Sequence, residues 1–218
     1  MQIAAEFVTS AAGAGDFPRD RLPEVVLVGR SNVGKSSLIN ALARRPLART
    51  SAAPGKTRLA NFYRLKRGNA PAMYLVDLPG YGYARGGGPA AEEFRTLTNA
   101  YFDRGRPDAG TEAGGPEKGA DSGLPIGVLL LVDARHPGLE SDLEAWQWVR
   151  SEAASGRVIG TSVIGTKADK LTRAERARHT RELETLFDSP VALFSARTGE
   201  GLEELWKLIA RLPSRTAA

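Results

Sequence analysis

Cysteine is absent from this chain of 218 residues, and its absence excludes several kinds of chemistry. A disulfide framework, a thiolate metal site and a cysteine nucleophile all need the missing thiol. Histidine is nearly as scarce, since His136 and His179 are the two present and neither lies in a cluster with metal-ligand spacing. We expect both at the surface or its boundary, with the chemistry carried by other side chains.

Long apolar runs are missing as well. The longest, Val128–Val132, is far shorter than the roughly 20 residues that a membrane-spanning helix needs. The N-terminus also lacks the basic and then apolar plan of a signal peptide. These features predict a cytoplasmic protein with no membrane partner.

The composition allows one well-buried domain. Hydrophobic residues make up 42% of the chain, and its length does not demand a second core. Lysine and arginine number 30 against 25 aspartates and glutamates, and the pI is near 9.7. This basic excess permits an anionic partner without proving one.

The stretch Gly29–Ser37 fits the pattern G-x-x-x-x-G-K-[ST]. Its glycines let the loop curl so that backbone N–H groups point at a polyphosphate, while Lys35 reaches the β and γ oxygens and Ser36 meets Mg²⁺. Such a loop works between a buried strand and a helix N-terminus, whose dipole favours anions. Glu24–Val28 has the pattern of that strand and Ser37–Leu42 of that helix. The context favours a nucleotide site over a chance glycine turn.

Strands alternate with helices along the rest of the chain, which predicts an α/β fold: a doubly wound, mostly parallel sheet with helices on both faces. Lys66–Asn69 is a turn typical of antiparallel neighbours. Capping boxes at Ser141–Glu144 and Thr172–Glu175 each predict a helix start. We expect strands at Asn61–Leu65, Ala72–Asp77, Pro125–Asp133, Arg157–Thr166 and Val191–Phe194, and helices over 89–104, 141–154, 172–187 and around Leu202–Ile209.

Three segments lie outside this alternation. Residues 1–23 are expected to form an N-terminal extension packed on a nucleotide-binding domain of residues 24–212, and Met1–Asp16 could add an edge strand or a helix end. Residues 213–218 would be a tail. Gly105–Gly123 has six glycines, two prolines and no large apolar residue. It cannot bury enough surface to offset its ordering entropy, so a disordered insertion is predicted.

Two strand ends carry motifs for the nucleotide. Asp77–Gly80 fits D-x-x-G, in which the carboxylate holds Mg²⁺ through water and the glycine N–H meets the γ-phosphate, although the same letters also form a common turn. Thr166–Asp169 fits [NT]-K-x-D. A carboxylate there can accept both N1–H and N2–H of guanine, a pair of donors that adenine lacks, and the stem of Lys167 can lie along the ring. The alternative is a solvated turn.

Two weaker signals complete the set. Ser195-Ala196 fits the loop whose backbone N–H meets guanine O6. Thr57 directly follows Arg44–Lys56, a stretch that is predicted to be a mobile loop, and a threonine in this loop can complete the Mg²⁺ shell. Each motif alone is a hypothesis. In this order, each at the end of a strand, they predict binding of GTP and GDP with Mg²⁺.

These stretches resemble the EngB (YihA/YsxC) family of bacterial GTPases from about Phe7 to Leu212. Asp77–Ala84, Asp-Leu-Pro-Gly-Tyr-Gly-Tyr-Ala, is specific to that family rather than to GTPases at large. The resemblance implies a single translation-factor-class GTPase domain with the P-loop GTPase fold, residues 24–212, needed for normal cell division and septation through assembly of the large ribosomal subunit. We expect the protein to act as a monomer. Its partner would be ribosomal RNA or a large-subunit precursor. The other stretches that carry the resemblance are Gly29–Ser37, Arg49–Ser51, Pro54–Thr57, Asp133–Pro137 and Thr166–Leu171.

The family's nucleotide contacts are carried over motif by motif, with Mg²⁺ on Ser36 and Thr57. The second motif departs from the family in reading Ala52-Ala-Pro-Gly-Lys-Thr-Arg58, which keeps Thr57, and the 105–123 insertion is longer than the family needs. The resulting positions are Gly29, Arg30, Ser31, Asn32, Val33, Gly34, Lys35, Ser36, Gly55, Lys56, Thr57, Arg58, Leu59, Asp77, Leu78, Pro79, Gly80, Thr166, Lys167, Ala168, Asp169, Ser195, Ala196 and Arg197.

The rate of hydrolysis is expected to be slow. In Ras-type switches a glutamine just after D-x-x-G orients the attacking water, and here that position is Tyr81. No residue is a certain catalyst, and Lys35, Asn32 and Thr57 are supportive. Asn32 occupies the place at which related GTPases hold K⁺ against the β/γ bridging region, or it braces the loop by a hydrogen bond.

Two functions stay open on the sequence. One is an assembly or division switch that binds a ribosomal precursor, and the other is a signalling-type GTPase that acts on a protein partner without RNA. Basic side chains flank the loop that carries Thr57, here called the first switch loop, and others lie around the start of one helix. Glutamates lie among the basic residues of that helix, so a solvated face is the alternative to an RNA site. The basic residues are Arg44, Arg45, Arg49, Lys167, Lys170, Arg173, Arg176, Arg178 and Arg181.

Overall fold

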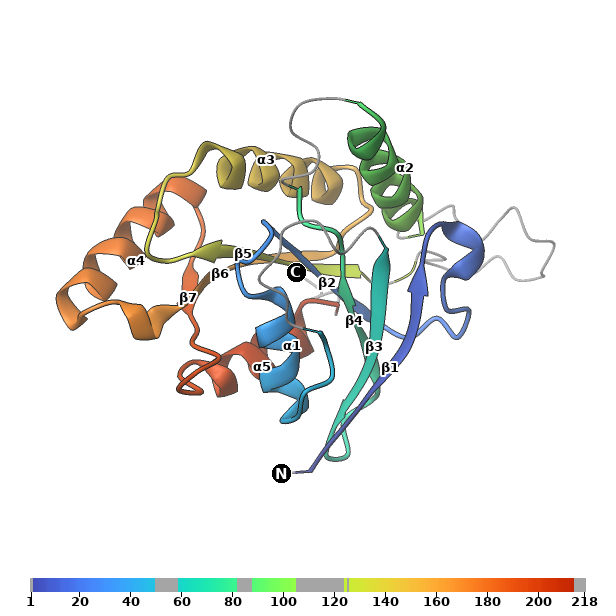
Figure 1. The fold of residues 1–218 in the computed structure, drawn as a ribbon, viewed down its shortest axis with the longest axis horizontal. Coiled ribbons are helices and arrows are strands. Elements are labelled where there is room, and N and C mark those ends of the chain that lie inside the picture. The colour runs from blue at the N-terminus through green and yellow to red at the C-terminus, as the bar shows by residue number, and fades with distance from the viewer. Residues whose placement is uncertain (1, 50–58, 82–87, 105–123, 125, 214–218) are drawn as a thin grey trace.

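The computed structural model describes residues 2–49, 59–81, 88–104, 124 and 126–213. In these ranges the chain forms a seven-stranded sheet in the order β1-β3-β4-β2-β5-β6-β7, flanked by helices (Figure 1). The strands are β1 (Ile3–Ala11), β2 (Glu24–Gly29), β3 (Ala60–Arg67), β4 (Met73–Asp77), β5 (Ile126–Asp133), β6 (Gly160–Thr166) and β7 (Val191–Leu193). The helices are η1 (Ala14–Asp16), α1 (Lys35–Ala43), α2 (Pro89–Asp103), α3 (Glu140–Ala154), η3 (Ala168–Lys170), α4 (Arg173–Phe187) and α5 (Leu202–Arg211).

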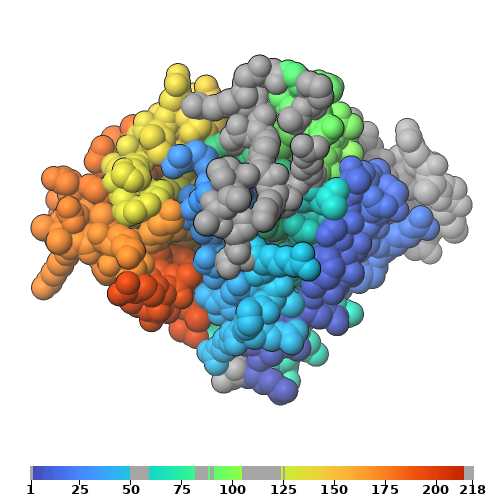
Figure 2. Space-filling view, viewed as in Figure 1, coloured from blue at the N-terminus to red at the C-terminus, as the bar shows by residue number. Residues whose placement is uncertain are grey.

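The sheet is mostly parallel, which confirms the predicted fold class. Strand β2 pairs in parallel with β4 and β5, and β5, β6 and β7 continue the parallel part. The pairs β3–β4 and β1–β3 are antiparallel, so the turn after β3 joins antiparallel neighbours as predicted. Of the two alternatives for the N-terminal residues, the edge strand is the one formed. Figure 2 shows β1 in dark blue at the surface, beside β3.

The core lies on both faces of this sheet. Val26 and Val28 of β2 pack toward α2, α3 and α4, whereas Val25 and Leu27 pack toward α1 and α5. Figure 1 shows the two helical layers on opposite sides of the strands. A strand covered on both faces needs a continuous apolar run rather than an alternating one, which is how β2 and β5 read in the sequence. Each such buried side chain contributes about 1.5–3 kcal/mol.

Four parallel strands end at the same edge of the sheet. The register pairs Leu27 of β2 with Asp77 of β4 on one side and with Leu129 of β5 on the other. Strand β5 then ends at Asp133, opposite Thr166 at the end of β6. The loops that follow β2, β4, β5 and β6 therefore meet above this edge, where ligands of open α/β sheets bind.

One of the two predicted capping boxes is confirmed and the other is wrong. The capping box at Thr172 and Glu175 is present and opens α4 as predicted. The one predicted at Ser141 is wrong, because α3 already begins at Glu140, with the carbonyl of Leu139 accepting the first helical N–H groups and no side-chain cap.

Strand β6 begins later than the predicted Arg157. The N–H of Arg157 donates to the carbonyl of Glu152, which closes the turn after α3, and its guanidinium pairs with Glu152 and Asp103. The expectation for the histidines holds for His136, which is exposed. It is wrong for His179, which is buried with its ring Nδ1 2.8 Å from the carbonyl oxygen of Ala134.

Three predictions fall wholly or largely outside the described ranges: the disordered insertion at Gly105–Gly123, the loop that carries Gly55, Lys56, Thr57 and Arg58, and the tail, of which residues 214–218 are not described. None of the helices that the structure describes has the length and apolar character that a bilayer span requires.

Candidate functional site

The phosphate loop, Gly29–Ser36, joins the end of β2 to the start of α1. Gly34 caps α1 with φ 118°, a backbone conformation that glycine adopts without strain. A Cβ on Gly29 would lie 2.8 Å from Cγ1 of Val33, so the loop closes tightly only with glycine there. The first turn of α1 thus directs its N–H groups into the loop, a ready anion site.

Lys35 and Asp77 are buried at the base of this loop. Nζ of Lys35 donates to the carbonyl oxygens of Gly29 at 3.1 Å and Arg30 at 3.4 Å. Burial lowers the pKa of Lys35, and the charge of Asp77 opposes that shift. Burial raises the pKa of Asp77 to about 6, and the charge of Lys35 opposes that shift too. Two opposite charges therefore interact in a buried site.

One carboxylate oxygen of Asp77, the buried Oδ1, has no hydrogen-bond donor among the described residues. A buried acceptor without a partner is costly unless a ligand or water satisfies it. This oxygen suits a water held by a metal ion, the role that the D-x-x-G motif predicts.

The segment Leu78–Gly80 packs directly on the phosphate loop. A Cβ on Gly80 would lie 2.7 Å from the backbone N of Ser31, so no larger residue fits that close approach. The next residue, Tyr81, is buried and turns toward α3, where its hydroxyl donates to the carboxylate of Asp142. The position that carries the water-orienting glutamine in Ras-type switches is therefore bonded to α3.

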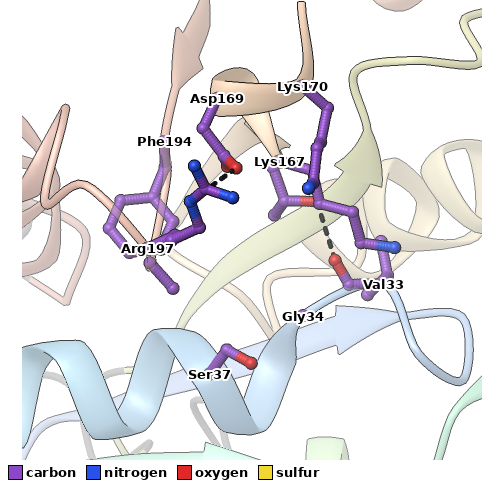
Figure 3. Close-up of a pocket in the computed structure, with 10 residues that line it drawn as sticks. Val33, Gly34, Ser37, Lys167, Asp169, Lys170, Phe194 and Arg197 are labelled. Atoms are coloured by element: carbon purple, nitrogen blue, oxygen red, sulfur yellow. Dashed lines mark hydrogen bonds and ion pairs between the residues drawn. The ribbon is translucent and has the colours of Figure 1, made fainter. Parts of the chain in front are cut away.

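A pocket of about 190 Å³ opens beside the phosphate loop (Figure 3). The base loop, Thr166–Asp169, lines it together with Phe194, Ala196 and Arg197, and Val33 and Gly34 of the phosphate loop form the opposite side. A site of this kind, partly apolar with a few convergent polar groups, suits a planar base.

The carboxylate of Asp169 is held in place within this pocket. The buried hydroxyl of Ser195 donates to Oδ1 of Asp169 at 2.7 Å. Nε of Arg197 lies 3.6 Å from Oδ2 of the same carboxylate (Figure 3). The Ser195 hydroxyl, with a smaller contribution from Arg197, holds the pKa of Asp169 below its ordinary value. The sequence motif anticipated a backbone role for Ser195 but not this side-chain role.

The base loop and the phosphate loop touch. The hydroxyl of Thr166 lies 2.7 Å from the carbonyl oxygen of Val33, and Nζ of Lys167 donates to the carbonyl oxygen of Asn32 at 2.8 Å. Lys167 also contacts Asp133, a residue whose role the sequence did not reveal. The sequence feature that could have indicated this role is the position of Asp133 at the end of β5, at the same edge of the sheet as the other motifs.

The four described motifs therefore lie at one edge of the sheet: Gly29–Ser36, Asp77–Gly80, Thr166–Asp169 and Ser195–Arg197. Leu59 is exposed just before β3. Thr57, the second residue assigned to Mg²⁺, lies with Gly55, Lys56 and Arg58 outside the described ranges. In the described part of the chain, no three His, Cys, Asp or Glu side chains gather as a metal site.

Comparisons with known proteins point in one direction. A family model described as a 50S ribosome-binding GTPase matches residues 24–109. A protein of Heliobacterium modesticaldum named probable GTP-binding protein EngB is 41% identical over 94% of this chain and 90% of its own length. The crystal structure of a probable GTP-binding protein engB covers 87% of this chain and 98% of that chain at 22% identity, with a TM-score of 0.55.

A second solved structure shares the fold. Era, crystallised in complex with MgGDPNP and nucleotides 1506–1542 of 16S ribosomal RNA, aligns with a TM-score of 0.64 and 22% identity over 87% of this chain and 56% of that chain. At these identities the two structures show a shared fold and no more.

Proposed function

Because this chain belongs to the EngB family of GTP-binding proteins, we propose that it is a Mg²⁺-dependent GTPase switch in assembly of the large ribosomal subunit, needed for normal cell division and septation. In this proposal the chain acts as a monomer. It binds a ribosomal RNA or large-subunit precursor in one nucleotide state and releases it in the other.

The observation that supports this proposal best is the junction of the two loops. The phosphate loop and the base loop are in direct contact through Lys167 and Thr166, and the carboxylate of Asp169 lies in the adjoining pocket. A guanine base in that pocket would present N1–H and N2–H to Asp169 while its phosphates reach the N-terminus of α1. The backbone N–H of Ala196 would serve guanine O6.

Magnesium is the metal proposed for this site. The unpartnered Oδ1 of Asp77 suits a metal-bound water, and the hydroxyl of Ser36 stands at the start of α1, next to Lys35. Ser36 and Thr57 would hold the ion. When bound, Mg²⁺ neutralises charge on the β and γ phosphates. Lys35 itself binds those phosphates and, being buried, loses little energy to solvent screening.

Hydrolysis is proposed to be slow without help. Tyr81 turns its hydroxyl to α3 rather than toward the phosphates, and the described residues offer no glutamine or histidine in its place. A fixed cation near the bridging oxygen, such as K⁺, or a group from a partner would then supply the missing stabilisation of charge in the transition state.

Ribosomal RNA is the proposed partner. The matching family model carries ribosome binding in its description, and Era was crystallised with ribosomal RNA. In this chain Arg44 and Arg49 are exposed next to the first switch loop, where cationic side chains could meet phosphates. The family resemblance supports the proposed role in septation.

Sedimentation of cell extracts tests the partner. We expect the protein to migrate with large-subunit precursors in the presence of a non-hydrolysable GTP analogue and to leave them with GDP. Because binding to RNA releases counterions, the association should weaken steeply between 50 and 200 mM salt, on the order of tenfold or more. If the amount of protein that sediments with the precursors changes with neither nucleotide nor salt concentration, the result would favour the other function, a signalling-type GTPase acting on a protein.

A further inference from the structure

Asp133 is a buried carboxylate that no sequence motif of the nucleotide site includes. It ends β5 with 4% of its surface exposed. Arg135 donates to both of its oxygens, from Nε to Oδ1 at 2.9 Å and from Nη2 to Oδ2 at 2.7 Å, and the backbone N–H of Arg135 adds a third bond at 3.1 Å. This bidentate hydrogen bonding fixes the orientation of the Asp133 carboxylate.

The second oxygen also faces the base loop. Nζ of Lys167 lies 2.9 Å from Oδ2 of Asp133 and donates at 2.8 Å to the carbonyl oxygen of Asn32. The ammonium of Lys167 is therefore held between a carboxylate at the end of β5 and the backbone of the phosphate loop.

The two loops joined by this ammonium are both strained. Lys167 has φ 60° and Asn32 has φ 62°, the left-handed region that non-glycine residues rarely adopt. Residues held there persist only when their surroundings over-determine them, and they cluster at ligand sites. A single ammonium connects these two positions, which lie far apart in the sequence.

Burial by itself raises the pKa of the Asp133 carboxyl. The hydrogen bonds from Arg135 and Lys167 outweigh that effect and hold the pKa well below its ordinary value. The carboxylate thus stays ionised near neutral pH and keeps its attraction for the ammonium.

We propose that Asp133 is a positioning residue for guanine-nucleotide binding: it holds the amine of Lys167 against the phosphate loop, so that the stem of Lys167 forms a fixed wall of the base pocket. The inference rests on the proposed nucleotide site. Lys167 lines that pocket beside Val33 (Figure 3). Asp133 acts through Lys167 and need not touch the nucleotide. Its effect should fall equally on GDP and GTP, since both carry the base and the β-phosphate.

A double-mutant cycle tests this directly. Titration of a fluorescent GDP analogue should show a loss of about tenfold in affinity for Asp133→Asn and at least as much for Lys167→Met, which keeps the stem and removes the amine. The double variant should bind no more weakly than Lys167→Met alone, since without the amine Asp133 has nothing to hold. Losses that multiply in the double variant would overturn the inference.

Matched controls separate positioning from folding. Arg135→Gln removes a partner of Asp133 but leaves the contact to Lys167, and it should cost less than about threefold. Glu24→Gln alters another buried carboxylate of the sheet, at the opposite end of β2, and should leave GDP affinity unchanged. If Asp133→Asn does not fold, Asp133→Ser, which keeps a small acceptor, should show the same loss of affinity at a temperature where its circular dichroism shows it to be folded. Unaltered affinity in a folded Asp133 variant contradicts the inference.

Asp169→Asn distinguishes this inference from the proposed site. If that variant binds GDP as the parent does, the pocket is not a guanine site and both proposals fail. If it loses GDP while Asp133→Asn retains it, the site stands and the role of Asp133 alone is wrong.

Discussion

The hydroxyl of Tyr81 donates a 2.7 Å hydrogen bond to Oδ1 of Asp142, which connects the end of the D-x-x-G segment to helix α3. Nε of Arg30, the second residue of the phosphate loop, lies 2.9 Å from the same oxygen. Asp142 is almost fully buried, and three segments of the chain thus meet at one carboxylate. The side chain of Tyr81, the residue after Gly80, therefore has a structural partner in α3 and does not point toward the nucleotide site.

Replacing Tyr81 by phenylalanine should therefore affect stability more than catalysis. The variant leaves the buried Asp142 short of a donor while Arg30 remains, so the free energy of unfolding should fall by about 1–2 kcal/mol. GTP turnover should change by less than about threefold. Urea denaturation and a phosphate-release assay measure the two effects. A tenfold loss of turnover at unchanged stability would show that the phenol takes part in hydrolysis.

Base selectivity should reside in Asp169. In Asp169→Asn the amide can no longer accept both guanine donors, but it can donate to the C2 carbonyl of xanthine. We expect guanine nucleotides to lose at least tenfold in affinity and xanthine nucleotides to gain, in competition titrations with both bases. Equal binding of ATP and GTP by the unmutated protein would refute the assignment of Thr166–Asp169 as the base loop.

The fold and the four described motifs could be predicted because each depends on short-range sequence. Strands β2 and β5 read as continuous apolar runs since helices cover both faces, and the glycine pattern of the phosphate loop follows from local backbone geometry. The links between segments could not be predicted. Tyr81 meets Asp142, and Lys167 meets Asp133, only because strand order places those elements side by side.

The wrong helix start at Ser141 has the same cause. Ser141 and Glu144 fit a capping box by their spacing, and a local pattern cannot report that Asp142 is drawn inward by Tyr81 and Arg30. Helix α3 instead begins one residue earlier, with the backbone of Leu139 serving its first turn. Tertiary contacts decided that boundary.

The phosphate contacts should separate into two classes. Lys35→Ala removes the charge that is proposed to bind the β-phosphate, so the affinities for GDP and GTP should both fall by about tenfold or more. Thr57→Ala should weaken GTP far more than GDP, because a switch-loop threonine reaches Mg²⁺ only when the γ-phosphate has drawn the loop in. Calorimetric titration of both nucleotides measures the difference. Equal losses in the Thr57 variant would rule out a switch role for its loop.

The stability of the protein should depend on pH through Glu24. Burial at the start of β2, opposed by the charge of Arg104, raises the pKa of Glu24 from 4.5 to about 7. Between those values the folded protein holds a proton that the unfolded chain has released, so the free energy of unfolding should fall as pH rises, by up to about 3 kcal/mol from this group.

The variant Glu24→Gln isolates that contribution. Its unfolding free energy, measured by urea denaturation without nucleotide at pH 5 and pH 8, should lack the part of the decline that Glu24 causes in the parent. A parent whose stability relative to the variant rises over this range would mean that the ion pair with Arg104 outweighs burial.

Potassium should accelerate hydrolysis through Asn32. Since Tyr81 faces α3, intrinsic turnover should lie near the unassisted range of about 10⁻⁴ to 10⁻² s⁻¹. A cation fixed against the bridging oxygen of the β and γ phosphates would stabilise the charge that develops there. Asn32 is the residue proposed for this task, and its backbone is held at φ 62° with its carbonyl oxygen accepting a hydrogen bond from Lys167. Turnover measured in matched potassium and sodium buffers should be several-fold higher in potassium, and Asn32→Ala should abolish the difference while GDP affinity stays within about threefold. Equal turnover in the two salts, or a potassium preference that survives the substitution, would make Asn32 a brace of the phosphate loop and leave acceleration to a partner.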